Sequence, residues 1–218
     1  MKSAEYIQLC LRTEKKDYLM KEINGLSPRF EHAVVGLCTE VGELLDQVKK
    51  HKIYGKPFDV VNAVEEMGDL YWYLSLACDS IGVDEYENLR AVRSDKITMK
   101  FVPQPFLAME LLSRELNLPV TLINLECRIA ALLGLTTELY KECANCKLKL
   151  ATFNRPKVML LLSSIENELT QLCYLYNTRD YDVWRRNIDK LRARYPEKYS
   201  DAHALNRDLS VERKILES

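Results

Sequence analysis

Glycine and proline are scarce in this 218-residue chain, which contains seven of each. All glycines but Gly134 lie at or before Gly82. Tight turns depend on these two residue types, so chains built from many short strands use more of them. Neither of the two commonest glycine-rich phosphate loops, G-x-G-x-x-G and G-x-x-x-x-G-K-[ST], occurs in the sequence. The scarcity argues against an all-β or a Rossmann chain and favours long helices.

The chain also lacks an excess of charge, since 31 Lys and Arg stand against 32 Asp and Glu. Nucleic acids and anionic membrane surfaces attract strongly basic domains, so we predict neither as the main partner. The longest strongly apolar run, Val158–Ile165, is far too short to span a bilayer. With 47% hydrophobic residues, the chain can bury a core, which excludes a disordered or fibrous protein.

The seven cysteines form an odd and irregularly spaced set, and the N-terminal residues contain no apolar signal segment. Both features predict reduced thiols in a cytoplasmic protein. One C-x-x-C pair is present, Cys143 and Cys146, without a second pair or a nearby histidine. We therefore interpret this pair as part of the apolar core rather than as half of a zinc site.

Helix start and stop signals divide the chain into a series of helices. Ser27-Pro28 and Asp59 are clear starts, because serine and aspartate cap helix N-termini and proline fits the first turn. We predict an all-α helical bundle, in which segments 3–23 and 201–216 are also compatible with helix. The main helices are expected at about residues 28–51, 59–80, 84–102, 119–150, 156–177 and 180–194.

Three sequence elements recur in the same order. The stretch 33–40 matches 131–138 at an offset of 98, Lys56-Pro57 matches Arg155-Pro156 at 99, and Asp95-Lys96 matches Asp189-Lys190 at 94. Small changes of offset are expected from loop insertions in a duplicated unit, so we predict an internal duplication. The predicted organisation is an N-terminal helix (1–28), a first repeat (29–102), a connecting helix (103–125), a second repeat (126–200) and a tail (201–218).

Two acidic pairs, Glu40-x-x-Glu43 and Glu66-x-x-Asp69, lie in the first two main helices. A spacing of three residues places both carboxylates of a pair on one helix face, about 60° apart. Each pair borders an apolar stripe, and a helical hairpin would pack the two stripes antiparallel, so we expect all four carboxylates to meet. The stripes are Ala33, Leu37, Val41, Leu44 and Val48, and Ala63, Met67, Leu70, Leu74 and Ala77.

Four converging carboxylates need positive charge or protons. At a separation of about 4–5 Å, each pair repels by roughly 3–4 kcal/mol at an effective dielectric constant of 20. Oxygen-only ligands favour hard cations, so we predict Mg²⁺, with Mn²⁺ possible. A di-iron bundle would need Glu-x-x-His pairs, and no histidine of the chain has such a partner. Gly42 and Gly68 lie inside the two pairs, where we expect them to allow close approach of helices.

This pattern resembles the motif of the MazG-like, all-α nucleoside triphosphate pyrophosphohydrolases. The likeness rests on the two acidic pairs, the 22 residues between them and the Leu-Tyr-Trp-Tyr-Leu that follows, and it covers residues 30–82. It returns over 180–214, where Asn187-x-x-Lys190-Leu-x-x-Arg194-Tyr-Pro occurs. In most members we expect this helix soon after the second acidic pair, whereas here residues 84–179 intervene.

The resemblance implies an enzyme that hydrolyses (deoxy)nucleoside triphosphates to the monophosphate and pyrophosphate with Mg²⁺. Glu40, Glu43, Glu66 and Asp69 would hold the metal and serve catalysis, with water attacking the α-phosphorus. Tyr73 would border the nucleotide. The predicted phosphate-binding residues are Asn187, Lys190, Arg194 and Lys96, which is the first-repeat counterpart of Lys190.

The second repeat does not keep the acidic site. In place of Glu40, Glu43, Glu66 and Asp69 it has Glu138, Lys141, Ile165 and Glu168. A lysine repels a cation and an isoleucine offers no oxygen, so we predict one active site per chain. Because members of the resembled family look like dimers that share a pocket, the second repeat is expected to act as a built-in partner. The chain would then be pseudo-dimeric, and a homodimer is also possible.

Two alternatives stay open at this point. The enzyme could be restricted to one pyrimidine nucleotide, dUTP or dCTP. The chain could instead be a helical interaction module that kept the fold and lost the chemistry. The presence of all four acids in the first repeat favours an enzyme.

Overall fold

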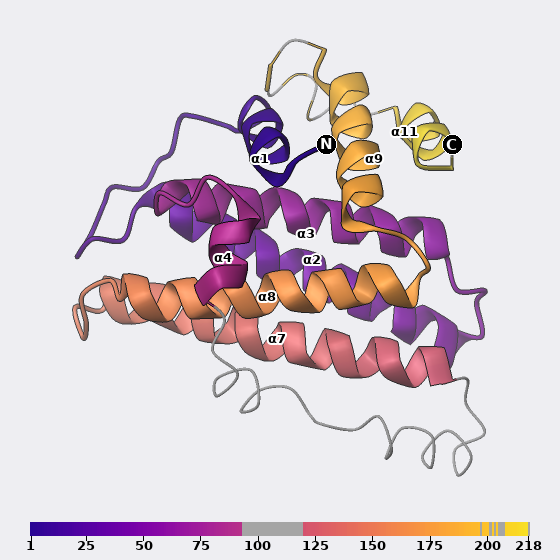
Figure 1. The fold of residues 1–218 in the computed structure, drawn as a ribbon, viewed down its shortest axis with the longest axis horizontal. Coiled ribbons are helices and arrows are strands. Elements are labelled where there is room, and N and C mark those ends of the chain that lie inside the picture. Colours follow the sequence, from indigo (N-terminus) through magenta and orange to yellow (C-terminus); the bar gives the residue numbers. More distant parts are fainter. Residues whose placement is uncertain (93–119, 197, 201, 203, 205–207, 218) are drawn as a thin grey trace.

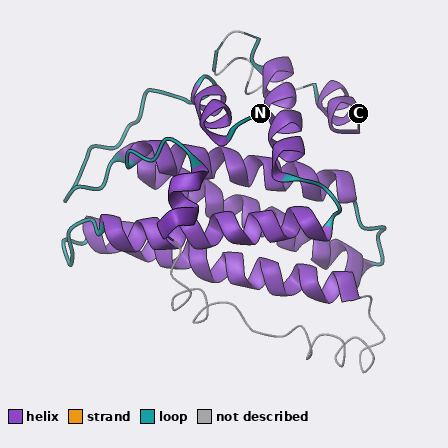
Figure 2. Ribbon diagram, viewed as in Figure 1, coloured by secondary structure: helices purple, strands orange, loops and turns teal. Residues whose placement is uncertain are grey.

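The structure, a computed structural model, describes residues 1–92, 120–196, 198–200, 202, 204 and 208–217. Among these residues the regular elements are all helices, and the only strand-like pairing is a bridge between Ile23 and Leu26 (Figure 2). The prediction of an all-α fold is confirmed. The helices are α1 (Ser3–Leu11), α2 (Pro28–Tyr54), α3 (Val60–Ser80), α4 (Tyr86–Val92), α7 (Val120–Lys147), α8 (Arg155–Leu175), α9 (Asp180–Arg194) and α11 (Leu209–Glu217).

Four long helices form the centre of the fold. Helices α2 and α3 make one hairpin and α7 and α8 make another, and the four lie side by side in Figure 1. Helix α2 packs against α7 and α3 against α8, so a single hydrophobic core joins both hairpins. Helices α1 and α9 pack on α3, while α4 packs on α8. No helix of the described residues is long and apolar enough to cross a membrane.

The two predicted apolar stripes are buried in the hydrophobic core to which the packed helices α2 and α3 both contribute. Every one of their ten residues is at most 3% exposed. Fully burying a Leu, Val or Met side chain contributes roughly 1.5–3 kcal/mol, so the stripes hold this hairpin together. The acidic pairs beside the stripes are thereby carried on two helices that pack directly against each other.

Local signals fix the ends of these two helices. The Ser27 side chain accepts a hydrogen bond from the Phe30 backbone N–H at 3.1 Å, and Pro28 occupies the first turn. Gly55 ends α2 at a φ of 65°, which a residue without a side chain adopts easily. Asp59 caps α3 by accepting from the Asn62 N–H at 3.0 Å. The predicted starts of α2 and α3 are confirmed.

Two predicted helices differ from expectation. The segment 3–23 is helical only to Leu11, and in the loop that follows the side chain of Glu14 bonds Arg29 on α2. Within the predicted tail helix 201–216, Asp208 is not helical, and α11 begins at Leu209, where the Asp208 side chain accepts N–H groups of the first turn. Residues 93–119 lie outside the described residues, and with them Lys96 and most of the predicted connecting helix. Its described end, 120–125, belongs to α7.

All seven cysteines are free, and five are buried. Cys143 and Cys146 lie in the hydrophobic core, as predicted for the C-x-x-C pair. Burial raises the pKa of Cys143 to about 12, so this thiol stays protonated at neutral pH. Cys38 and Cys127 are only half-buried.

These environments predict two classes of thiol. In the folded protein, a thiol reagent should modify Cys38 and Cys127 first, and the remaining five should react only as the chain opens. In denaturant without reductant, the count should rise to seven. Zinc bound in stoichiometric amount and released by Cys143→Ser would contradict the assignment of the pair to the core.

Candidate functional site

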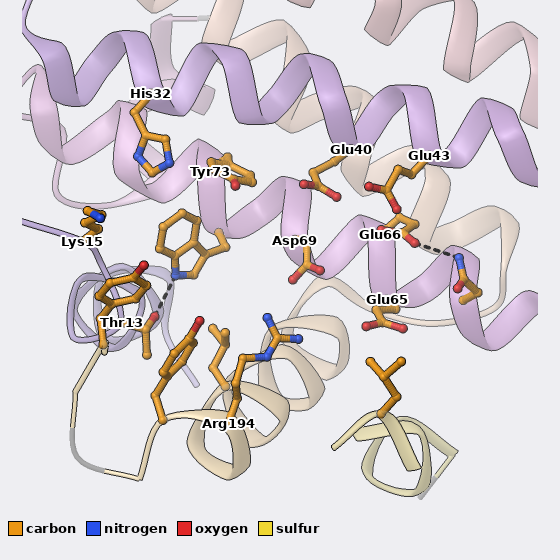
Figure 3. Close-up of a pocket in the computed structure, with 16 residues that line it drawn as sticks. Thr13, Lys15, His32, Glu40, Glu43, Glu65, Glu66, Asp69, Tyr73 and Arg194 are labelled. Atoms are coloured by element: carbon orange, nitrogen blue, oxygen red, sulfur yellow. Dashed lines mark hydrogen bonds between the residues drawn. The ribbon is translucent and has the colours of Figure 1, made fainter. Parts of the chain in front are cut away.

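A cavity of about 540 Å³ lies where α2 and α3 face α9 (Figure 3). Glu40, Glu43 and Glu66 lie at one end of it, and His32 and Lys15 lie at the other. Its size falls within the range of small-molecule sites. The cavity therefore has a strongly acidic end and an end that is largely aromatic.

At the acidic end, one carboxylate oxygen each from Glu40, Glu43 and Glu66 lies within 4.8 Å of the others. Glu66 is buried, Glu40 is half-buried and Glu43 is exposed. Asn62, one helical turn before Glu66, donates from Nδ2 to Glu66 Oε1 at 2.8 Å. Three oxygen donors converging from two helices are a ligand set suited to a hard divalent cation.

The crowding of these groups changes their proton affinity. Burial, and after it the neighbouring carboxylates of Asp69, Glu43 and Glu40, together raise the pKa of Glu66 to about 8. Burial and the charges of Asp69 and Glu43 likewise raise the pKa of Glu40 to about 7. A cation bound among these oxygens would relieve the repulsion, so the charges present fit a metal ion.

Asp69 departs from the prediction that all four acids meet. It is not among the three acids that lie within 4.8 Å of one another. Both of its oxygens accept from Lys190 Nζ on α9, at 2.7 and 2.6 Å, and Asn187 Nδ2 donates to Oδ1 at 2.8 Å. The physical reason is the buried ammonium group, which draws the nearest carboxylate to itself.

Lys190 is fully buried, and its ammonium also lies 3.2 Å from Glu65. Burial alone would lower the pKa of Lys190, but Asp69 and Glu65 raise it, so the side chain stays charged. Asn187 and Lys190 thus lie at the acids of the first repeat, as predicted. Lys190 nevertheless contacts carboxylates and is not among the residues that line the cavity.

Small residues allow these close contacts. A Cβ atom at Gly68 would lie 3.0 Å from Asn187 Cβ, so Gly68 lets α9 approach α3. A Cβ atom at Gly36 would lie 2.1 Å from the ring of Tyr73, so Gly36 makes room for this tyrosine at the cavity. Gly42 has no atom within 4 Å of such a Cβ, so its predicted role in helix approach is wrong.

Arg194 lines the cavity from α9. Its guanidinium bonds both oxygens of Glu212 on α11, at 2.8 and 2.6 Å. Among the predicted phosphate-binding residues that the structure describes, Arg194 is the cation that faces the cavity. Lys96 lies outside the described residues.

Sequence reasoning missed several residues of the site. Thr13 and Lys15 line the cavity from the loop after α1, and Tyr195 and Tyr199 follow α9. No local pattern marks these positions, because they reach the cavity only through the path of their loops. Asn62 had a signal, since a spacing of four residues places it beside Glu66 on one helix face.

The acids at the aligned positions of the predicted second repeat have other partners. Glu138 pairs with Lys141 at 2.7 Å, and the fully buried Glu168 pairs with Arg128 at 2.8 Å. Among the described residues, no further group of acids, histidines or cysteines lies close enough together to hold a metal ion. Glu40, Glu43 and Glu66 are therefore the candidate ligand group within the described part of the chain.

The buried ion pair predicts a large stability effect. Lys190→Met should lower the free energy of unfolding by roughly 3 kcal/mol, because it leaves Asp69 and Glu65 without their cation. The control is Lys141→Met, which removes an exposed ion pair and should cost less than about 1 kcal/mol. Urea denaturation measures both. Similar values for the two variants would show that the Lys190 contacts add little to stability.

The raised pKa of Glu66 predicts that Glu66→Gln stabilises the protein when EDTA is present. A carboxyl whose pKa rises on folding destabilises the folded protein progressively as the pH increases. The effect begins near the pKa that the carboxyl has in the unfolded chain and is complete above its pKa in the folded protein, here about 8. At pH 8 the melting temperature should therefore rise by about 2–4 °C, equivalent to roughly 1 kcal/mol. At pH 4 the gain should vanish. A lower melting temperature at pH 8 would contradict the assignment.

The comparisons with known proteins give no family for this chain. No family model matches it, no curated protein matches it, and no solved structure matches it. The resemblance to MazG-like pyrophosphohydrolases stays a prediction from the sequence motifs.

Proposed function

We propose that this protein is a Mg²⁺-dependent nucleoside triphosphate pyrophosphohydrolase of the MazG-like type. The observation that carries the proposal is the group Glu40, Glu43 and Glu66, whose carboxylates converge at one end of a cavity large enough for a nucleotide. The substrate would be a nucleoside triphosphate, and the products would be the monophosphate and pyrophosphate.

The polarity of the cavity orients such a substrate. Phosphates would lie toward the acidic end, since only a cation held there can join them to carboxylates. The base would lie at the other end, where the rings of Tyr73 and His32 pack edge to face with their centroids 5.6 Å apart. Aromatic side chains offer flat apolar surface for a base. Tyr73 lines the cavity and would border the nucleotide there.

The chain's own residues divide the remaining tasks. Glu40, Glu43 and Glu66 would hold the cation, which when bound neutralises phosphate charge and lowers the pKa of a water molecule. Asp69 is positioned by Lys190 and Asn187 next to this group. Arg194 faces the cavity and would meet phosphate oxygens, because a guanidinium forms strong bonds with them. We assign Lys190 to positioning Asp69 rather than to direct phosphate contact.

The packing of the helices supports the proposed duplication. The third helix of each repeat packs on the second helix of the other, α4 on α8 and α9 on α3. In a two-fold arrangement, residues near the axis contact their own counterparts. Cys38 Sγ lies 3.6 Å from the carbonyl oxygen of Thr136, and these two residues are 98 positions apart in the sequence. The hydroxyls of Tyr71 and Thr170, 99 positions apart, lie 3.5 Å from each other. These are the offsets of the sequence repeat.

A built-in partner follows from this arrangement. Helix α9, from the second repeat, brings Asn187 and Lys190 to Asp69 of the first repeat. The second repeat would thus complete the site while its own acids are paired with Lys141 and Arg128. One working site per chain is part of the proposal.

The proposal predicts metal-dependent release of pyrophosphate. The eight common ribo- and deoxyribonucleoside triphosphates should be tested with Mg²⁺, and at least one should yield monophosphate and pyrophosphate. EDTA should abolish this activity. Glu43→Gln should lower kcat by at least about 100-fold, because Glu43 helps to place charge at the transition state and its exposed side chain is not needed for folding.

The control is Glu138→Gln, the same substitution at the predicted second-repeat counterpart of Glu40, which should leave activity within about twofold of wild type. Equal loss in the two variants, or activity that persists in EDTA, would contradict the proposal. A folded protein that hydrolyses none of the eight nucleotides would favour the non-catalytic module instead.

A further inference from the structure

Glu14, in the loop after α1, is a buried carboxylate with an unusually complete set of donors. Its side chain is 1% exposed. It accepts from Arg29 at 2.7 and 2.8 Å, from Lys16 Nζ at 2.6 Å and from the Tyr18 hydroxyl at 2.9 Å. Burial alone would raise the pKa of Glu14, but these hydrogen bonds lower it, so the carboxylate is ionised at neutral pH.

The charge on Glu14 fixes the direction of the next hydrogen bond. An ionised carboxylate can only accept, so the single proton of the Tyr18 hydroxyl points to Glu14. The Tyr18 oxygen then has only lone pairs left. His32 Nδ1 lies 3.4 Å from that oxygen, and a bond between them requires that Nδ1 carries the proton.

The other ring nitrogen of His32 follows from this. Burial lowers the pKa of His32, so the ring is neutral at pH 7 and carries one proton only. With that proton on Nδ1, Nε2 is a bare acceptor. Figure 3 shows the imidazole pointing from α2 into the cavity, beside Tyr73. The nearby indole N–H of Trp72 is already bonded to Thr13 and to the Cys10 carbonyl.

We propose that His32 is a specificity-determining residue whose Nε2 accepts a hydrogen bond from the exocyclic amino group of the substrate base, as in cytosine or adenine. This inference rests on the proposed function, because it requires the base to lie at the His32 end. A carbonyl oxygen at the same position would face the lone pair of Nε2. The ring N–H of uracil is a poorer partner, since two flanking carbonyl oxygens would repel that lone pair.

The tautomer can be measured without any substrate. In ¹⁵N-labelled protein, two-bond nitrogen–proton correlation spectra distinguish the two neutral forms of histidine, and the chain has only three histidines to assign. We expect His32 to carry its proton on Nδ1. Tyr18→Phe removes the accepting oxygen and should move the proton to Nε2, the usual position in free histidine. A proton on Nε2 in the wild type would overturn the inference.

Selectivity is the second test. CTP is compared with the pyrimidin-2-one nucleotide that lacks the amino group, and ATP with the purine nucleotide that lacks it. The wild type should prefer the nucleotide with the amino group by at least about tenfold in kcat/KM, because a base without this group leaves the acceptor His32 Nε2 unpaired. His32→Phe should reduce this preference to about twofold, whereas His51→Phe, remote from the cavity, should leave it unchanged.

The outcomes separate the two proposals. If no nucleotide is hydrolysed, the proposed function fails, and the tautomer measurement still decides the state of His32. If the wild type hydrolyses nucleotides but treats amino and amino-free bases alike, or accepts only UTP, dUTP and dTTP, whose bases carry no amino group, the proposed function stands and the role of His32 is overturned.

Discussion

The buried ammonium of Lys190 is the charge on which the arrangement of the site depends. A fully buried lysine is tolerated only with carboxylate partners, and α9 therefore has to lie where Asp69 and Glu65 can reach it. Gly68 permits the approach, and the Tyr6 hydroxyl on α1 donates to Asn187 Oδ1 at 3.0 Å from the other side. Three segments distant in the sequence are thus held together around one ion pair.

Because Lys190 pairs with Asp69, the negative charges of the other three acids of the two acidic pairs have no such cationic partner among the described residues. Lys190 neutralises Asp69, while Glu40, Glu43 and Glu66 stay together with raised pKa values at Glu40 and Glu66. Such a group costs stability unless protons or cations bind to it. Sites that violate the ordinary rules of charge placement are where function is expected, and this one opens onto a cavity.

Much of the fold could be predicted because its signals are local. The apolar stripes follow the helical period, and the caps at Ser27 and Asp59 lie next to the helices they start. The acidic pairs were placed correctly on facing helices for the same reason. The path of the loop after α1 could not be predicted, because the contact that holds Glu14 in this loop is to Arg29, 15 residues away.

The position of Asp69 shows the same limit within the site. Its motif spacing predicts a fourth member of the acid group, yet its partner Lys190 lies 121 residues away. A helical projection treats each helix alone, so it cannot predict a contact between side chains of two helices that are distant in the sequence, such as Asp69 and Lys190. The repeat offers a partial route, since a two-fold arrangement of the repeats would bring α9 to α3.

Binding of Mn²⁺, followed by the electron paramagnetic resonance signal of the free ion, tests the central claim most directly. The account predicts saturable binding to the wild type and its loss in Glu66→Gln. Glu168→Gln, at a buried acid outside this group that pairs with Arg128, should retain binding if the variant is folded. Absence of saturable binding to the wild type, or equal binding to wild type and Glu66→Gln, would contradict the assignment of these acids as a metal site.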